Sequence, residues 1–338
     1  MTKFLIVSVF CFSFAYLFLS IRQFYGLLDE GLILYNAKLM LAGKVLYRDF
    51  WTVYPPGQFF LTVLLFKIFE TSAFVVRIFD LLVRSGLVAM IFYILSERVS
   101  RNLALLGSVV VLIIINPQDS LGNNFANGLI IVLLLSLFSL VSLFRYYRCD
   151  GKRYLFICGF LLGLVETMRT DMGFYAFFAV FFVLGTHSFI KTKKFGKEFF
   201  TLMGVFLFGV VIPVSVEIFY LLMNVSINDL LNDLVIYPLT IYPEVRALPL
   251  FALNNRPYAL YSFIFSLLIF VVWMIVWVKN LKNDDRFWEH LTLVVLGSFF
   301  LIKGITRMDE IHVMPAFVIA IMLGVILLGK FNKSSLKY

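Results

Sequence analysis

Long apolar stretches alternate with short polar ones along almost the whole 338-residue chain. A helix that crosses a bilayer needs about 20 mostly apolar residues and closes its backbone hydrogen bonds within itself. The pattern predicts ten such spans, at residues 4–21, 73–96, 102–116, 124–144, 154–168, 172–190, 199–223, 258–278, 288–303 and 311–329. We therefore expect an all-α, polytopic helical bundle that forms a single integral-membrane domain over residues 1–338.

Residues 58–69 are apolar as well, but they are too few for a full crossing. About 12 residues at a rise of 1.5 Å extend only about 18 Å, against a hydrocarbon core of roughly 30 Å. We interpret this segment as a half-helix or re-entrant piece. A second span with different neighbours is the alternative.

The loop of residues 22–57 contains an amphipathic stretch that begins at Asp29. Apolar residues recur there at helical spacing, which predicts a helix lying along the membrane interface. Asp29 suits the N-cap of that helix and the positive end of its dipole. Because neighbouring positions on a helix point about 100° apart, Asp29 and Glu30 are expected to have different roles.

Composition and charge support the membrane assignment. The chain is 62% hydrophobic and 14% charged, against about 45–50% and about 25% in soluble domains. This excludes a soluble enzyme, a nucleic-acid-binding module and a disordered chain. The net charge of +9 reflects topology, because 17 of the 29 basic residues fall in alternate loops and at the termini. Basic loops stay in the cytoplasm, so both termini are expected there, provided that residues 58–69 do not cross.

The remaining loops, on the extracytoplasmic side, hold most of the candidate chemistry. The loops 22–57 and 224–257 are far longer than the usual helix connections of about 2–8 residues. Ionisable groups at the membrane boundary are costly and are functional candidates by default, with internal salt bridging as the alternative. They are Glu166, Arg169, Asp171, Lys303, Arg307, Asp309, Glu310 and His312. Glu166 is spaced to pair with Arg169, and Arg77, Asp80 and Arg84 are spaced for structural ion pairs.

Several motifs are absent from the sequence. No P-loop or dinucleotide-binding glycine pattern is found, which argues against a nucleotide site. Three scattered cysteines and the lack of a His-Glu-x-x-His motif argue against a tightly held metal. Gly159 and Gly163 are spaced for a close helix contact.

The first loop carries a recognisable motif. An acidic pair, Asp29-Glu30, follows the first span, and the segments 47–51 (Tyr-Arg-Asp-Phe-Trp) and 54–57 (Tyr-Pro-Pro-Gly) lead into the short apolar helix. This order resembles the GT-C superfamily of integral-membrane glycosyltransferases, closest to the protein O-mannosyltransferases and aminoarabinose transferases. The loop 229–249 and the turn 307–312 resemble bacterial members of that group.

The resemblance implies a sugar donor carried on a polyprenyl phosphate and a catalytic base at Asp29. Glu30 would support the base or make a weak contact to a divalent cation, and no other cofactor is expected. Direct displacement of a lipid phosphate needs a base and cations near the departing oxygens. The donor-phosphate residues are then Arg169, Lys303, Arg307 and His312. Contacts to substrate or loop are expected from Tyr54, Asp171, Tyr242, Arg246, Arg256 and Asp309.

The predicted function is inverting transfer of a sugar to an acceptor hydroxyl on the outer face of a bacterial inner membrane. The acceptor, a glycan, a lipid or a protein, is left open, and no nucleic-acid partner is expected. Two alternatives are a transporter or flippase of an anionic lipid-linked substrate and a non-catalytic partner of a full-length transferase. The first alternative requires charged residues along a path through the bilayer.

Overall fold

The computed structural model describes residues 2–22, 29–117, 125, 128–246, 257–280 and 286–335. All ten predicted spans are helices, which confirms the all-α membrane bundle. They are α1 (Thr2–Phe18), α4 (Ala73–Ser96), α5 (Arg101–Ile114), α6 (Gly128–Cys149), α7 (Lys152–Met168), α8 (Thr170–Thr192), α9 (Lys197–Asn224), α13 (Pro257–Asn280), α14 (Phe287–Thr306) and α15 (Glu310–Ser335).

Seven of these helices are long and apolar enough to cross a membrane, and α1, α5 and α7 are shorter. The prediction for the first span was too long, because α1 ends at Phe18 and hydrogen-bonded turns follow up to Ile21. Residues 57–68 form the separate helix α3 (Gly57–Ile68). Its 12 residues match the predicted short element.

The remaining helices lie between the spans. The amphipathic stretch is α2 (Asp29–Leu41), as predicted. The long loop after α9 folds into α10 (Ile227–Leu231), the π-helix η1 (Asn232–Ile236), α11 (Tyr237–Leu239) and α12 (Ile241–Arg246). The sequence pattern did not identify these four short helices.

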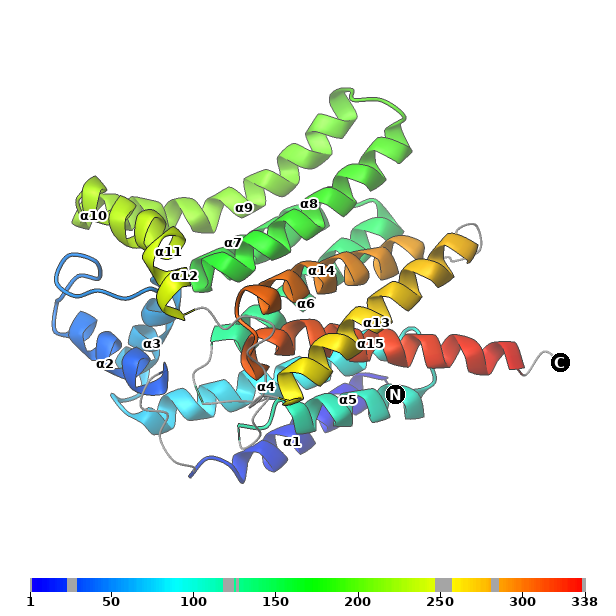
Figure 1. The fold of residues 1–338 in the computed structure, drawn as a ribbon, viewed down its shortest axis with the longest axis horizontal. Coiled ribbons are helices and arrows are strands. Elements are labelled where there is room, and N and C mark those ends of the chain that lie inside the picture. The colour runs from blue at the N-terminus through cyan, green and yellow to red at the C-terminus, as the bar shows by residue number, and fades with distance from the viewer. Residues whose placement is uncertain are drawn as a thin grey trace.

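The spans run roughly parallel to one another, so the molecule has two distinct ends (Figure 1). One end holds the start of α1 and the ends of α4, α6, α8, α13 and α15, and we call it the terminal end. The other, the loop end, holds α2, α3 and α10–α12. The basic loops therefore share the terminal end, as the alternating charge pattern requires.

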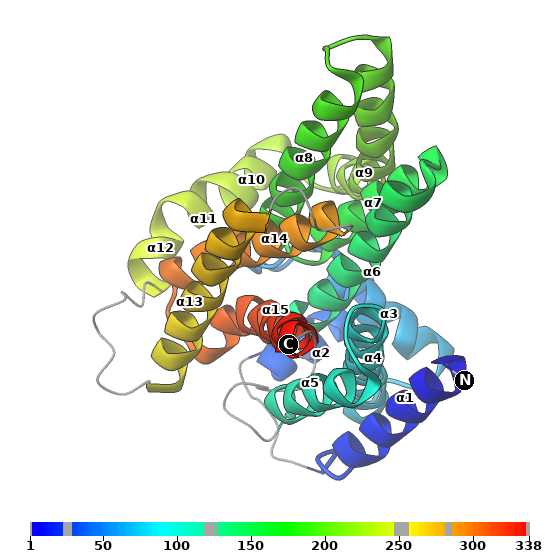
Figure 2. The ribbon, with the colours of Figure 1, turned by 90° about the vertical axis from the view of Figure 1, so that its right-hand side faces the viewer.

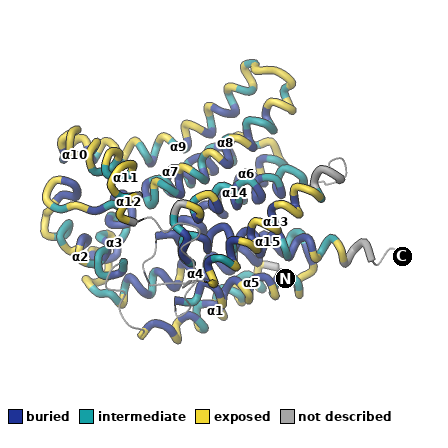
Figure 3. Tube along the Cα trace, viewed as in Figure 1, coloured by how far each residue is buried: buried dark blue, intermediate teal, exposed yellow. Residues whose placement is uncertain are grey.

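The bundle has a buried centre and an exposed periphery. Within the helix windows that are long enough to span, 78% of α15 and 67% of α4 is buried, against 28% of α9. Viewed along the bundle, α15 and α4 are surrounded by other helices, whereas α9 lies at the rim (Figure 2). The exposed faces of the outer helices are visible in Figure 3. These faces carry large apolar side chains such as Phe208 and Phe219 and suit contact with lipid.

Glycines allow two close helix contacts. A Cβ at Gly159 would collide with the carbonyl oxygen of Phe206 on α9, and one at Gly163 would collide with the ring of Pro213. This confirms the contact predicted from their spacing. A Cβ at Gly57 would likewise collide with the carbonyl group of Thr167 at the end of α7. The Pro-Pro-Gly motif therefore starts α3 directly against the end of α7, beside Arg169.

Candidate active site

The first loop is a rigid frame built around Tyr47. This residue is 5% exposed and adopts the left-handed region at φ 67°, which is unusual for an aromatic residue. Its backbone N–H donates to the carbonyl of Phe50 over 2.9 Å, and its hydroxyl donates to the carbonyl of Tyr54 over 2.6 Å. Burial raises the pKa of Tyr47, so the hydroxyl stays protonated and available as a donor. The frame fixes the position of Tyr54.

Asp49 closes the same frame. Its carboxylate accepts a hydrogen bond from the Val45 N–H over 2.8 Å and pairs with Arg48 at 3.0 Å. The hydrogen bond from Arg48, reinforced by that from Val45, lowers the pKa of Asp49 to about 2.

Tyr54 connects the predicted base to the predicted phosphate-binding residues. Its hydroxyl lies 3.4 Å from Oδ1 of Asp29 at the start of α2. The guanidinium carbon of Arg169 stands 5.4 Å from the centre of its ring, within the range of a cation–π contact. Asp29 and Arg169, 140 positions apart in the sequence, are thus joined through one aromatic side chain.

Arg169 lies between α7 and α8 and pairs with Asp171. Both contacts between the guanidinium and the carboxylate measure 3.2 Å, a two-pronged geometry that fixes the arginine. Nζ of Lys303, in the last turn of α14, reaches the same carboxylate at 2.9 Å. Two cations from different helices therefore share Asp171. The pair between Glu166 and Arg169 that the spacing allowed is replaced by this arrangement.

The turn between α14 and α15 adds a second group. Nε of Arg307 donates to Asp309 over 2.7 Å, and the His312 ring contacts the other carboxylate oxygen. The backbone N–H of His312 also donates to Asp309 over 3.0 Å, so the aspartate caps α15. Burial would raise the pKa of Asp309, but the bonds from His312 and Arg307 hold it well below its ordinary value.

The two groups belong to one cluster. Arg169 and Lys303 lie near enough to the His312 ring for their charges to act on it, and Tyr242 of α12 lies similarly near Arg169. The ring of Trp51 packs edge-on against Tyr237 of α11, with centroids 4.8 Å apart, so the long loop meets the first one. We call the set Arg169, Asp171, Lys303, Arg307, Asp309 and His312 the loop-end cluster. Its three permanent cations outnumber its two carboxylates.

Glu30 lies apart from this cluster. Its side chain is 1% exposed, and both carboxylate oxygens accept from Arg77 of α4, at 2.6 and 2.9 Å. Arg77 also donates to the carbonyl of Ile21 over 2.7 Å and faces the Phe125 ring at 4.5 Å. One arginine thus ties the end of α1, the start of α2 and the segment after α5 together beside Asp29.

The sequence placed Arg77 with Asp80 and Arg84 and missed its bond to Glu30. Asp80 pairs with Arg84 at 2.6 Å, as the spacing predicted. One aspartate cannot neutralise two buried arginines, and this surplus was the signal that a second carboxylate had to come from elsewhere in the chain.

Several acidic and basic residues lie outside these contacts. Arg256 and the side chain of Arg246 lie outside the described residues. Glu166 and Glu217 lie near one another, and Oε2 of Glu217 is buried without a hydrogen-bond partner among the described atoms. Within the part of the chain that the structure covers, no group of three or more His, Cys, Asp or Glu side chains is arranged to hold a metal.

Comparison with known proteins supports the resemblance to membrane glycosyltransferases. Residues 53–216, which include Tyr54, Arg169 and Asp171, match the family model "Dolichyl-phosphate-mannose-protein mannosyltransferase". The fold matches the crystal structure of ArnT from Cupriavidus metallidurans bound to undecaprenyl phosphate, with a TM-score of 0.62 over 96% of this chain. The chain has the GT-C fold. The resemblance predicted from the first loop is therefore confirmed.

The similarity to ArnT is low in sequence and covers only part of that protein. Sequence identity is 12%, and the chain spans 60% of the length of that protein. No curated protein matches the sequence significantly. The shared GT-C fold therefore does not assign roles to individual side chains, whose own geometry decides what each can do.

Proposed function

We propose that the protein is an inverting glycosyltransferase that moves a sugar from a polyprenyl phosphate to an acceptor hydroxyl. One observation carries the proposal: Tyr54 contacts Asp29 through its hydroxyl and Arg169 of the loop-end cluster through its ring. A base and a group of cations that both lie beside one residue suit displacement of a lipid phosphate. The matches to a mannosyltransferase family and to a structure holding undecaprenyl phosphate support the same class of donor.

The chemistry follows from the residue types. Asp29 accepts the proton of the acceptor hydroxyl as its oxygen forms a bond to the anomeric carbon. The bond between that carbon and the phosphate oxygen breaks in an oxocarbenium-like transition state, and the electron pair leaves with the polyprenyl phosphate. Direct displacement inverts the configuration. Phosphate is a good leaving group, so a second carboxylic acid is unnecessary.

The loop-end cluster is suited to the departing phosphate. Arg169 can present a planar fork to phosphate oxygens, and Lys303 and Arg307 add point charges from α14 and the turn after it. Asp171 and Asp309 hold these cations in place before the substrate arrives. Charges positioned in advance need no rearrangement as the phosphate becomes more negative, and one such donor contributes about 3 kcal/mol.

The position of Glu30 supports a different role from that of Asp29. With both oxygens engaged by Arg77, Glu30 holds the start of α2 and thereby places Asp29. We therefore assign Asp29 as the base and Glu30 as a positioning residue. The proposal uses no metal in any step.

The transporter alternative has less support. It needs charged groups along a path through the bilayer, and Asp80, Arg84 and Glu217 are the candidates. Asp80 and Arg84 are paired with each other, and Arg84 also donates to the carbonyl of Ile115. They tie α4 to the end of α5.

We also propose the extracytoplasmic side of a bacterial inner membrane for the loop end. The basic residues gather at the terminal end, which supports a cytoplasmic position for that end. The acceptor would then be a glycan, lipid or protein exposed outside the cytoplasm.

The test is replacement of the proposed base. Asp29→Asn keeps the size of the side chain but removes its basicity, so transfer from a polyprenyl-phosphate sugar should fall by about 100-fold to 10,000-fold. Asp229→Asn is the matched control, because Asp229 lies on the same end, in α10, and bonds Ser226 instead of the cluster. Equal turnover by the two folded variants would eliminate Asp29 as the base.

A further inference from the structure

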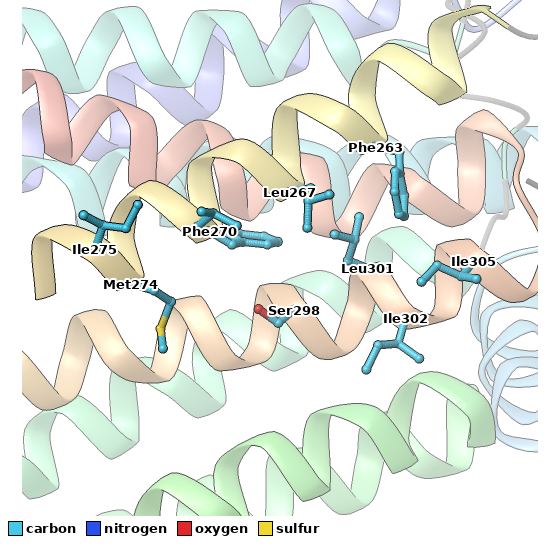
Figure 4. Close-up of a pocket in the computed structure, with 10 residues that line it drawn as sticks. Phe263, Leu267, Phe270, Met274, Ile275, Ser298, Leu301, Ile302 and Ile305 are labelled. Carbon is cyan, nitrogen blue, oxygen red and sulfur yellow. The ribbon is translucent and has the colours of Figure 1, made fainter. Parts of the chain in front are cut away.

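An apolar groove of about 620 Å³ lies between α13 and α14 (Figure 4). Six of its lining side chains are between 43% and 52% exposed, so the groove is open to the side; they are Leu267, Val271, Met274, Ile275, Ile302 and Ile305. In a membrane, this opening faces the hydrocarbon core. The volume falls within the range of about 300–1,000 Å³ typical of ligand sites.

Two loosely packed helices form the walls of the groove. Helices α13 and α14 each pack more extensively on α15 than on one another, and all ten lining residues belong to α13 and α14. Between the walls, a Cβ at Gly297 would lie only 2.5 Å from the tip of the Phe270 ring. The lack of a side chain at Gly297 lets the Phe270 ring lie against α14, where it lines the groove.

The lining of the groove offers no unpaired polar group to a ligand. Ser298 is the single hydroxyl residue among the ten that line the groove, and its hydroxyl donates to the Val294 carbonyl of its own helix over 2.8 Å. A polar ligand or a helix joined by hydrogen bonds would find nothing to bind there. The lining therefore fits a hydrocarbon chain, held by close packing against branched side chains.

The charges at the two ends of the groove give the occupant a direction. Phe263, near the start of α13, and Ile305, near the end of α14, mark the end of the groove that approaches the loop-end cluster. Lys303 follows Ile302 on α14, and Arg307 lies two residues beyond Ile305. From Phe263 to Ile275 the groove follows about 18 Å of helix, more than half of the roughly 30 Å core.

We infer that this groove receives the isoprenoid chain of the lipid donor, with its phosphate at Lys303 and Arg307. The inference rests on the proposed function for the identity of the head group. The chain enters sideways from the bilayer and lies along α13 and α14, which holds the anionic head in the loop-end cluster. The groove would thus set which lipids carry a usable sugar.

Photolabelling with an undecaprenyl phosphate that carries a diazirine in its chain tests this directly. The label should map to α13 and α14 in the wild-type protein. Ile302→Trp fills the groove and should reduce labelling about tenfold, equivalent to about 1.4 kcal/mol. Ile113→Trp on α5 is the matched control, because Ile113 is 51% exposed against 45% for Ile302 and lies outside the groove. Its labelling should equal that of the wild type.

The groove assignment is overturned if both variants label alike, or if the label maps mainly to another lipid-facing helix such as α9. It is also overturned if phosphatidylglycerol competes as well as unlabelled undecaprenyl phosphate, since the groove would then hold ordinary membrane lipid. Labelling needs no sugar transfer. If the label maps to α13 and α14 but the wild-type protein transfers no sugar, only the proposed transferase function is contradicted. If the protein transfers sugar but the label maps elsewhere, only the groove assignment is contradicted.

Discussion

The molecule has a charged cluster at each end, and the two are built from similar parts. At the terminal end, Glu97, Arg98, Arg148, Arg286 and Glu289 combine three arginines with two glutamates. We call them the terminal-end cluster. Glu289 pairs with Arg98 and with Arg148, the latter at 2.6 Å, and Arg148 also reaches Glu97 at 2.8 Å. The loop-end cluster likewise combines three permanent cations with two carboxylates.

The difference lies in what surrounds each cluster. The terminal-end cluster joins the end of α4, the end of α6 and the start of α14, and the Arg98 guanidinium also faces the Phe144 ring at 5.0 Å. The loop-end cluster is linked through Tyr54 to a strained loop and to Asp29, a carboxylate outside its own pairs, and two of its cations follow the groove residues Ile302 and Ile305 along the chain. The same set of charges can therefore hold helices together or, as we propose for the loop end, bind a ligand. The elements around each cluster determine which role it has.

The largest expected effect on stability is at the terminal end. Arg98 is 1% exposed, so Arg98→Met leaves Glu289 buried with one cation fewer and should lower the free energy of unfolding by about 3 kcal/mol. Denaturation in detergent measures this, with Arg101→Met at the exposed start of α5 as control. If the folded fraction of Arg98→Met transfers sugar at the normal rate, the terminal-end cluster has a structural role. A loss of turnover in the folded fraction would contradict this.

The corresponding change at the loop end should mainly affect activity. Arg169→Met removes a cation from the proposed phosphate site and should lower kcat/KM about 100-fold, from the loss of about 3 kcal/mol. Lys67→Met, at the exposed end of α3 and outside the cluster and the frame, is the control and should stay close to wild type. If the two variants transferred sugar equally well, the loop-end cluster would have no more catalytic role than the terminal-end one.

A smaller effect is expected from the frame around Tyr47. Tyr47→Phe removes the hydrogen bond to the Tyr54 carbonyl and should cost about 1 kcal/mol of stability. Because Tyr54 contacts Asp29, kcat/KM should fall as well. Tyr35→Phe, on the exposed face of α2, is the control. A stability loss with unchanged kcat/KM would make Tyr47 a structural residue only.

The smallest expected effect concerns Asp49. Its folded pKa of about 2 lies below the ordinary carboxyl value of about 3.9, so ionised Asp49 stabilises the fold above pH 4. This stabilisation is lost as the pH falls through 2. Asp49→Asn should therefore lower Tm slightly at pH 6, and its difference from the wild type should shrink on acidification. A difference that grows at low pH would contradict this sign.

The spans were predictable because the bilayer imposes a length. Helix α4 begins and ends where the apolar run does, and Ser72 caps it by accepting from the Phe74 N–H. The location of the loop-end cluster also followed from sequence, since Arg169 and Arg307 lie in turns on the side opposite the basic loops. Charge counting alone brings such turns to one end.

The pairing within the clusters was not predictable. Spacing along a helix favoured Glu166 for Arg169 and Asp80 for Arg77, but each arginine found a carboxylate outside that pattern. Ion pairs depend on which helices pack together, and this requires tertiary structure. The groove depends in the same way on the contact of Gly297 with Phe270 across two helices.

A double-mutant cycle on Asp29 and Arg169 tests the central claim most directly. If both act on one transition state, sugar transfer by the Asp29→Asn, Arg169→Met double variant should be little slower than that of the slower single variant. If the two losses multiply, the residues act independently, and the account of a base and a cation serving one displacement is contradicted.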